Sequence, residues 1–187
     1  DVLKRLVRHF SDPNVGAVQG RCVVRNSNET QLARTIAVDY YSGYLVNEYG
    51  RQSLYQLPAY GGSNCAVRAS WLQAFGGWNE NTVTEDTDLT MRLVMVGQFV
   101  RYDITAIDTE ESVPTFQRFW RQRYRWARGH QAAWREFRAP TLHTPALGFW
   151  GKVETIMFLL VYHVPVGPNL LLILSVTLHP KNTTAQW

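Results

Sequence analysis

The sequence predicts an α/β fold followed by a membrane-associated segment. Apolar residues at helical spacing alternate with short valine-rich runs, and after Pro140 the composition changes to a mostly apolar stretch. The 187 residues are 45% hydrophobic and 13% aromatic, enough for one domain with a full core and too apolar for a disordered chain. We expect residues 1–140 to form the α/β domain. Residues 141–187 should form a membrane-interface linker and a transmembrane segment.

Helices and strands alternate along the first half of the chain. The apolar spacing predicts a helix over residues 3–10, and the valine-rich run Val15–Val24 predicts a buried strand. A helix is expected over about residues 30–49, with Ser27 or Asn28 as its cap. Its many tyrosines suit packing against a core or a membrane interface.

The second half begins with the glycine-rich loop Tyr60-Gly61-Gly62-Ser63-Asn64. Glycines let a backbone approach a ligand closely, although they serve plain turns more often. The elements expected after this loop are a strand over 65–67, a helix over 70–75 stopped by Gly76-Gly77, a helix from Thr84 to Gly97, a strand over 99–107 and a helix over about 115–137.

Three carboxylates crowd the start of the predicted helix that begins near Thr84. They are Glu85, Asp86 and Asp88, and Thr84 stands near the N-cap. Acids in a first turn complement the helix dipole by about 0.3–1 kcal/mol each, so a purely structural role would account for them. Paired carboxylates also suit proton transfer, which leaves a catalytic role open.

A second group of residues lies on one face of the predicted helix over 115–137. Gln122, Arg125 and Trp126 are spaced at 0, +3 and +4. A guanidinium can bind a pyrophosphate with two hydrogen bonds, an indole offers a flat face to a sugar ring, and an amide can bind hydroxyls. The alternative is a basic amphipathic helix at the lipid headgroups. Both can hold, with the lipid contacts made by Arg118, Arg121, Arg128 and Arg135.

Positive charge is concentrated around this second group. The chain carries a net charge of +4, and seven arginines but only one acid, Glu136, lie between Arg118 and Arg138. Anionic lipid, pyrophosphate or nucleic acid could face such a block. Because an apolar stretch follows, anionic membrane lipid is the simpler partner, and we expect no nucleic acid. Cys22 and Cys65 have no metal-like spacing and should be buried reduced thiols, as in a cytosolic setting.

The apolar stretch over about residues 153–178 is long enough to cross a bilayer. As one helix of about 26 residues it would measure roughly 39 Å. We expect a kinked transmembrane helix, with a buried soluble helix as the alternative. The arginine block should lie on the cytoplasmic side. The chain opens directly on a helix pattern without a signal peptide, and we interpret it as an interior piece of a longer inner-membrane (plasma-membrane) protein whose catalytic part is cytoplasmic.

Together, the two motifs resemble those of the processive family 2 glycosyltransferases, such as cellulose, hyaluronan and poly-N-acetylglucosamine synthases. Thr84-Glu85-Asp86 is followed 36 residues later by Gln122-x-x-Arg125-Trp126, which Ala127-Arg128-Gly129 extends, and residues 61–63 match the acceptor-side loop. The resemblance implies the C-terminal half of a GT-A (Rossmann-like) glycosyltransferase domain, then amphipathic interface helices and a transmembrane helix.

The resemblance also implies a role for each motif residue in inverting transfer from a UDP-sugar to a growing β-linked polysaccharide. Asp86, within the motif Thr84-Glu85-Asp86, would be the general base, and its neighbours Glu85 and Asp88 would raise its pKa. Arg125 and Gln122 would face the donor diphosphate. Trp126 and Gln122 would hold the acceptor sugar, and the loop residues Tyr60, Gly61, Gly62 and Ser63 would line its path.

This sequence departs from the family in two features. Gly61 stands where cellulose synthases place a cysteine, which weakens any assignment to cellulose. The D-x-D motif that holds a divalent metal, Mg or Mn, is absent and is expected upstream, so no metal site is predicted in this chain, which alone should be inactive. The identity of the sugar stays open among glucose, N-acetylglucosamine and mannose. The alternatives are a nonprocessive lipid-linked glycosyltransferase and a non-catalytic membrane scaffold.

Overall fold

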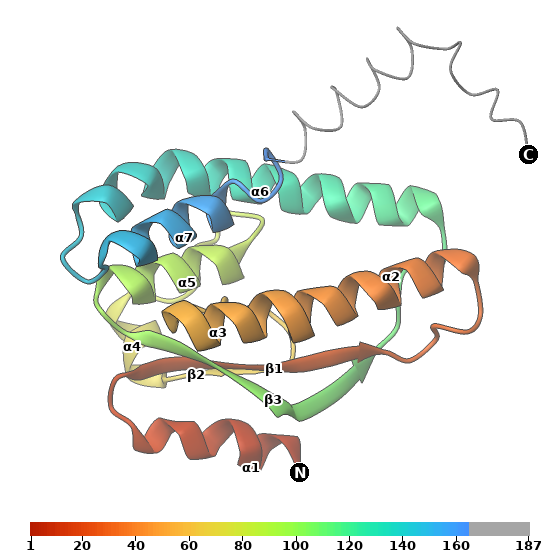
Figure 1. The fold of residues 1–187 in the computed structure, drawn as a ribbon, viewed down its shortest axis with the longest axis horizontal. Coiled ribbons are helices and arrows are strands. Elements are labelled where there is room, and N and C mark those ends of the chain that lie inside the picture. Colours follow the sequence, from red (N-terminus) through yellow and green to blue (C-terminus); the bar gives the residue numbers. More distant parts are fainter. Residues whose placement is uncertain (165–187) are drawn as a thin grey trace, which may run out of the picture.

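The computed structural model describes residues 1–164 and shows an α/β arrangement in which a three-stranded sheet lies between α1 and a set of helices on its other face (Figure 1). The elements in chain order are α1 (Val2–Val7), a 3₁₀ turn (Arg8–Ser11), β1 (Val15–Val24), α2 (Gln31–Ser42), a π-helical segment (Gly43–Glu48), α3 (Tyr49–Tyr55), β2 (Cys65–Val67), α4 (Ala69–Ala74), α5 (Glu85–Met95), β3 (Phe99–Glu110), α6 (Phe116–His143) and α7 (Phe149–Leu159).

β1 is the central strand, with β2 antiparallel on one side and β3 parallel on the other. The register of β1 and β3 shifts where Gly20 faces Asp103 but the next residue, Arg21, faces Ile107. The side-chain amide of Asn64 fills this irregularity by donating to the carbonyls of Arg21 and Ala106, at 2.9 and 2.8 Å. Bulges of this kind re-aim the chain near functional sites, and this one lies beside the loop over residues 60–64.

Three clusters of buried side chains hold the layers together. α1 packs beneath the sheet through Leu6 against Val18, and α5 packs above it through Leu93 against Ala17. The third cluster joins α5, α6 and α7, with Met91, Ala133, Phe137 and Leu159 at its centre. Consequently α6 and α7 form an outer layer over α5 (Figure 1).

The element boundaries confirm several expectations and correct others. Strands β1 and β2 have the predicted limits, and Gly76 and Gly77 end α4 with φ of +75° and +94°. Thr30 caps α2 by accepting a hydrogen bond from the N–H of Ala33 at 3.0 Å, so the expected caps Ser27 and Asn28 were wrong.

Two helices are longer than predicted. The helix expected over residues 30–49 continues through the π-helical segment and α3 to Tyr55. α6 runs through Pro140 to His143, past its predicted end at residue 137 and past the predicted domain boundary. Cys22 and Cys65 are free thiols, as expected, but only Cys22 is buried and Cys65 is partly exposed.

The stretch expected to form a kinked transmembrane helix over about residues 153–178 begins within α7, which starts at Phe149. α7 ends at Leu159, whose side chain is fully buried against α5 and α6, and a turn follows. In residues 1–164 no helix has the length and apolar character that crossing a bilayer requires. Val164 precedes a proline, a position that disfavours helix. The rest of the predicted span, residues 165–178, lies outside the described residues.

Candidate active site

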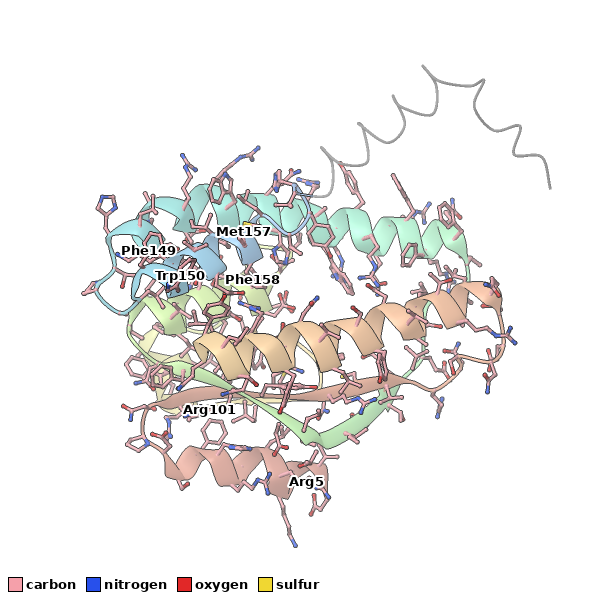
Figure 2. All side chains as sticks on the ribbon, in the orientation of Figure 1. Arg5, Arg101, Phe149, Trp150, Met157 and Phe158 are labelled. Atoms are coloured by element: carbon pink, nitrogen blue, oxygen red, sulfur yellow. The ribbon has the colours of Figure 1, made fainter. Side chains whose placement is uncertain are left out.

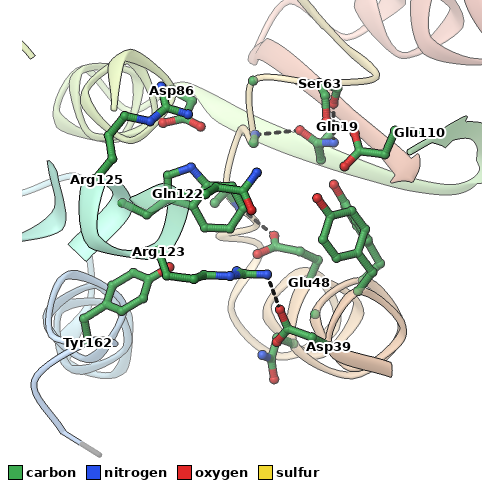
Figure 3. Close-up of a pocket in the computed structure, with 18 of the residues that line it drawn as sticks. Gln19, Asp39, Glu48, Ser63, Asp86, Glu110, Gln122, Arg123, Arg125 and Tyr162 are labelled. Carbon is green, nitrogen blue, oxygen red and sulfur yellow. Dashed lines mark hydrogen bonds and ion pairs between the residues drawn. The ribbon is translucent and has the colours of Figure 1, made fainter. Parts of the chain in front are cut away.

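A cavity of about 510 Å³ opens between the start of α5, the glycine-rich loop, α6 and the helical stretch from α2 to the π-helical segment (Figure 3). It brings together eight of the residues that the sequence predicted. They are Gly61, Gly62, Ser63, Glu85, Asp86, Gln122, Arg125 and Trp126. Two predicted residues, Thr84 and Tyr60, do not line it.

Asp86 stands in the first turn of α5 and faces this cavity. One carboxylate oxygen accepts a hydrogen bond from the N–H of Thr87 at 2.6 Å. Burial is the main reason why the pKa of Asp86 is raised, and the charge of Glu85 adds to it. Asp88, which we expected to contribute, is buried and forms an ion pair with Arg92 at 2.7 Å. The cavity therefore presents a carboxylate that holds a proton more tightly than usual.

Thr84 has a packing role instead of lining the cavity. It occupies the N-cap position of α5, but its side chain accepts no hydrogen bond from the helix, and it is only 5% exposed. Its methyl and hydroxyl groups lie against Gly129 of α6, where an added Cβ would stand 2.2 Å from Thr84 Cγ2. Thr84 and Gly129 thus let the two motif-bearing helices approach closely.

The loop brings backbone against the carboxylate of Asp86. Gly62 has φ of +77°, and a Cβ there would lie 3.1 Å from Oδ2 of Asp86. Tyr60 turns the other way, into the core beside Leu89, and packs against Trp78 with 6.0 Å between ring centroids. Tyr60 does not line this cavity, but with Gly62, Trp78 and Glu85 it lines a smaller one beside it, so its role on the acceptor's path stays a prediction.

Gln122 and Arg125 project from α6 into the cavity (Figure 3). Trp126 lines it as well, as the spacing predicted. The side chain of Arg125 is exposed and forms no hydrogen bond or ion pair with residues 1–164. Arg123, which the sequence analysis did not assign, also lines the cavity. It forms an ion pair with Asp39 at 2.6 Å and stacks on Trp126 at 4.3 Å from the ring centroid.

The remaining wall was missed from the sequence. It is formed by polar residues of α2, the π-helical segment and the end of β3, namely Asp39, Tyr40, Tyr44, Asn47, Glu48 and Glu110. Burial, together with Glu110, raises the pKa of Tyr40, so its phenol stays neutral and can donate a hydrogen bond. The tyrosines had been interpreted as core or membrane-interface residues. A π-helical segment often marks a functional site, but the sequence gives no signal for one.

Metal ligands do not gather in this part of the chain. In residues 1–164 no three side chains of His, Cys, Asp or Glu are placed to hold a metal ion together. Of the five carboxylates that line the cavity, two are engaged elsewhere: Asp39 with Arg123, and Glu48 with Arg51 and the N–H of Ala59. The donor set present here therefore does not fit a divalent metal.

Comparison with known proteins gives a consistent result. Residues 1–183 match the family described as glycosyl transferase family group 2. A probable glycosyltransferase, YdaM of Bacillus subtilis, is 35% identical over 65% of this chain and 29% of its own length. The beta-monoglucosyldiacylglycerol synthase of Synechocystis is 31% identical over 93% of this chain and 36% of its own length. Glucomannan 4-beta-mannosyltransferase 9 of Arabidopsis thaliana is 27% identical over the whole chain and 36% of its own length. The chain thus spans about a third of the length of these curated relatives.

Proposed function

The chain belongs to glycosyl transferase family group 2, and from this premise we propose that the protein transfers a sugar from a nucleotide sugar to an acceptor hydroxyl. One observation carries the proposal: Asp86, a buried carboxylate with a raised pKa, shares a cavity with Arg125 and Trp126. A base, a free cation and an aromatic face are the groups that such a transfer requires.

In this proposal Asp86 is the general base. The acceptor hydroxyl gives its proton to the carboxylate of Asp86 while its oxygen forms a bond to the anomeric carbon of the donor. The bond between that carbon and the diphosphate oxygen breaks, and the diphosphate leaves with the bonding electrons. Attack opposite the leaving group inverts the anomeric centre, so an α-linked donor gives a β-linked product. Glu85, beside the base, supports the raised pKa.

The residues of α6 take the other side of the reaction. Arg125 has no competing ion pair among the described residues, so its guanidinium can bind the diphosphate as negative charge develops there. Trp126 offers its face to the acceptor sugar, and the stacked guanidinium of Arg123 fixes the orientation of that indole. The amide of Gln122 can bind a sugar hydroxyl or a diphosphate oxygen.

We propose a polysaccharide as the acceptor, extended processively. The unpredicted wall carries carboxylates, phenols and an amide, which suit a ring with several hydroxyls. One relative is named as a glucomannan mannosyltransferase, in keeping with this acceptor. A glycolipid is the second candidate, because the relative named as a beta-monoglucosyldiacylglycerol synthase is 31% identical over 93% of this chain.

A divalent metal, Mg or Mn, would neutralise charge on the donor diphosphate in the whole enzyme. Because residues 1–164 offer no cluster of three metal-binding side chains, no step of this mechanism passes through a metal held by them. The steps derived above depend on the base, the guanidinium and the sugar-binding surfaces alone.

We also propose that the outer layer, α6 and α7, binds anionic lipid at the cytoplasmic face of the inner (plasma) membrane. Phe116, Trp120 and Tyr124 are 67%, 63% and 59% exposed at successive turns of α6. The exposed Arg118 and Arg121, on the same helix, form no ion pair within residues 1–164. Phe149 and Trp150 lie exposed at the start of α7 (Figure 2). Aromatic and basic groups on one helix are typical of interfacial binding. Sedimentation with vesicles that contain anionic lipid should weaken when Trp120 is changed to Ser, and an unchanged bound fraction would contradict this role.

The reaction is tested with the full-length native protein in membranes. Release of nucleoside diphosphate is measured with UDP-glucose, UDP-N-acetylglucosamine and GDP-mannose, each with a β-linked oligosaccharide or with diacylglycerol vesicles. We expect release with one donor and the oligosaccharide, abolished by Asp86→Asn but not by Asp108→Asn, an exposed carboxylate of β3 that does not line the cavity. Release that requires diacylglycerol would favour the glycolipid candidate. Full release from Asp86→Asn would contradict the mechanism.

A further inference from the structure

The stretch of chain over residues 59–63 is fixed by side chains from three separate elements. Three consecutive backbone N–H groups, those of residues 59–61, each donate to a different side chain. The acceptors are Glu48 of the π-helical segment for Ala59 at 2.7 Å, Thr90 of α5 for Tyr60 at 2.9 Å, and Gln19 of β1 for Gly61 at 2.6 Å. Loop N–H groups are usually left to water, so this arrangement ties the loop to α5, the sheet and the π-helical segment at once.

Gln19 holds this loop from two sides. While its oxygen accepts from the N–H of Gly61, its nitrogen donates to the carbonyls of Ser63 and Gly20, at 2.9 and 2.7 Å. Only a carboxamide offers an acceptor and two donors on one planar group. Gln19 is 1% exposed in a strand whose neighbours are apolar, a costly place for a polar side chain unless its hydrogen bonds are made.

The residue between Gly61 and Ser63 is the one whose backbone faces the proposed base. Gly62 lies between Gly61 and Ser63, and its backbone is so close to Asp86 that an added Cβ would stand 3.1 Å from Oδ2. Gln19 does not contact Asp86 itself. Its bonds to Gly61 and Ser63 hold the residues on both sides of Gly62, and so fix the backbone next to the carboxylate that an acceptor hydroxyl must approach.

We propose that Gln19 is a positioning residue, which sets the loop over residues 61–63 against Asp86 and thereby aligns the acceptor sugar for attack. This inference rests on the proposed function. It assigns a role to a residue outside both motifs, on a strand that carries none of the predicted site residues. Misplacement of a reacting group by about 1 Å can lower a rate about 100-fold, so a loop that moves by that amount is enough to matter.

A purely structural role would give a different result from a positioning role. If Gln19 only filled the core, its loss would lower stability and leave the kinetic constants of the folded protein unchanged. If it positions the loop, the acceptor constants change while those of the donor do not.

The test compares Gln19→Met with Gln98→Met in the full-length native protein. Methionine nearly conserves the volume of glutamine and removes its hydrogen bonds, and Gln98 lies outside the cavity with its side-chain oxygen unpartnered among residues 1–164. For Gln19→Met we expect an acceptor KM raised by about tenfold and a kcat lowered by about as much, because three buried hydrogen bonds are lost. The donor KM of Gln19→Met should stay within about twofold of the wild-type value. For Gln98→Met, kcat and both KM values should stay within about twofold of the wild type. A folded Gln19→Met protein with unchanged acceptor constants, or with a changed donor KM alone, would overturn the inference.

A second pair of variants covers the case in which Gln19→Met does not fold. Thr90→Val removes the hydroxyl that accepts from the N–H of Tyr60, whereas Thr90→Ser keeps it. We expect the valine variant to raise the acceptor KM and the serine variant to restore it. Equal values in both variants would contradict anchoring of the loop.

Hydrogen exchange separates this inference from the proposed function. In a peptide that covers residues 57–67, amide exchange should be at least about tenfold faster in Gln19→Met than in the wild type, because the lost hydrogen bonds protect those amides. The same increase is expected in Thr90→Val relative to Thr90→Ser. Neither result depends on whether the protein transfers sugar. Unchanged exchange would overturn the positioning role even in an active enzyme. Faster exchange in a protein without transferase activity would leave the loop assignment standing and remove the proposed function.

Discussion

The two walls of the cavity hold their polar groups in different ways. The α5 wall, formed by Glu85, Asp86 and the loop over residues 61–63, presents a carboxylate that no cation neutralises among the described residues. On the α2 wall, from α2 through the π-helical segment to Glu110, two of the three carboxylates are already paired: Asp39 binds Arg123, and Glu48 binds Arg51. The third, Glu110, lies beside the phenol of Tyr40. Paired groups can share hydrogen bonds with hydroxyls but are poorly placed to take a proton. The difference assigns chemistry to the α5 wall and recognition to the α2 wall.

The largest expected effect is on the α5 wall, at Asp86. Changing Asp86 to Asn removes the proposed base and should lower kcat by about 10²- to 10⁴-fold. The fold should not suffer. Because the pKa of Asp86 is raised in the folded state, ionisation of this carboxyl opposes folding. The protonated carboxyl stabilises the fold at low pH, and this stabilisation is lost as pH rises through the folded-state pKa. At pH 7 the variant should unfold thermally at the same temperature as the wild type or higher. A lower unfolding temperature would contradict the assignment of Asp86 as a buried base whose ionisation opposes folding.

The next effect is expected at Arg125, which faces the α5 wall from α6. Arg125→Ala should lower kcat by about 10²-fold, because charge on the leaving diphosphate loses its partner. Arg125→Lys should recover part of the rate, since it restores the charge but not the two-pronged hydrogen bonding. Single-turnover rates would measure both, with Arg128→Ala, on the exposed surface of α6, as the matched control. Equal losses at Arg125 and Arg128 would contradict a local role.

The distance between the two motif-bearing helices is set by Gly129. A methyl group there would stand 2.2 Å from Thr84, so Gly129→Ala should destabilise the protein by about 1–3 kcal/mol through overpacking. Activity should fall as well, because α6 is pushed away from Asp86. The double variant Gly129→Ala with Thr84→Ala removes the two nearest atoms and should recover part of the stability. No recovery in chemical denaturation would indicate that this contact is not the cause.

The smallest effect is expected on the α2 wall. Tyr40→Phe removes a neutral donor beside Glu110 and should raise the acceptor KM by about three- to tenfold, the cost of one hydrogen bond, with little change in kcat. Tyr41→Phe, an exposed neighbour on the same helix that does not line the cavity, is the control. A large fall in kcat for Tyr40→Phe would break the division between a reactive wall and a recognition wall.

The α5 wall could be predicted from the sequence, whereas the α2 wall could not. Strand β1, strand β2 and the start of α5 depend on local patterns of valine, glycine and acid, and they lie where those patterns placed them. The α2 wall depends on contacts between distant segments, such as Asp39 with Arg123, which are 84 residues apart. No local pattern encodes such a pair.

Two of the predicted site residues lie away from this cavity for a shared physical reason. Tyr60 and Thr84 belong to motifs whose neighbours line the cavity, yet both side chains are buried in packing contacts beneath it. A motif specifies which residues occur together but not which of them face the ligand. Similarly, the first part of the apolar stretch after residue 153 belongs to α7, which ends at Leu159, and that side chain packs against α5 and α6.

The pH dependence of kcat/KM tests the central claim most directly. Asp86 must be ionised to accept a proton, so activity should fall as pH drops through its raised pKa, with a midpoint above the ordinary aspartate value of about 3.9. Glu48 lines the same cavity and burial raises its pKa too, so the assignment requires that the acid limb vanish from the residual activity of Asp86→Asn. An acid limb that persists unchanged in that variant, or one centred at or below the ordinary value, would contradict a buried general base at Asp86.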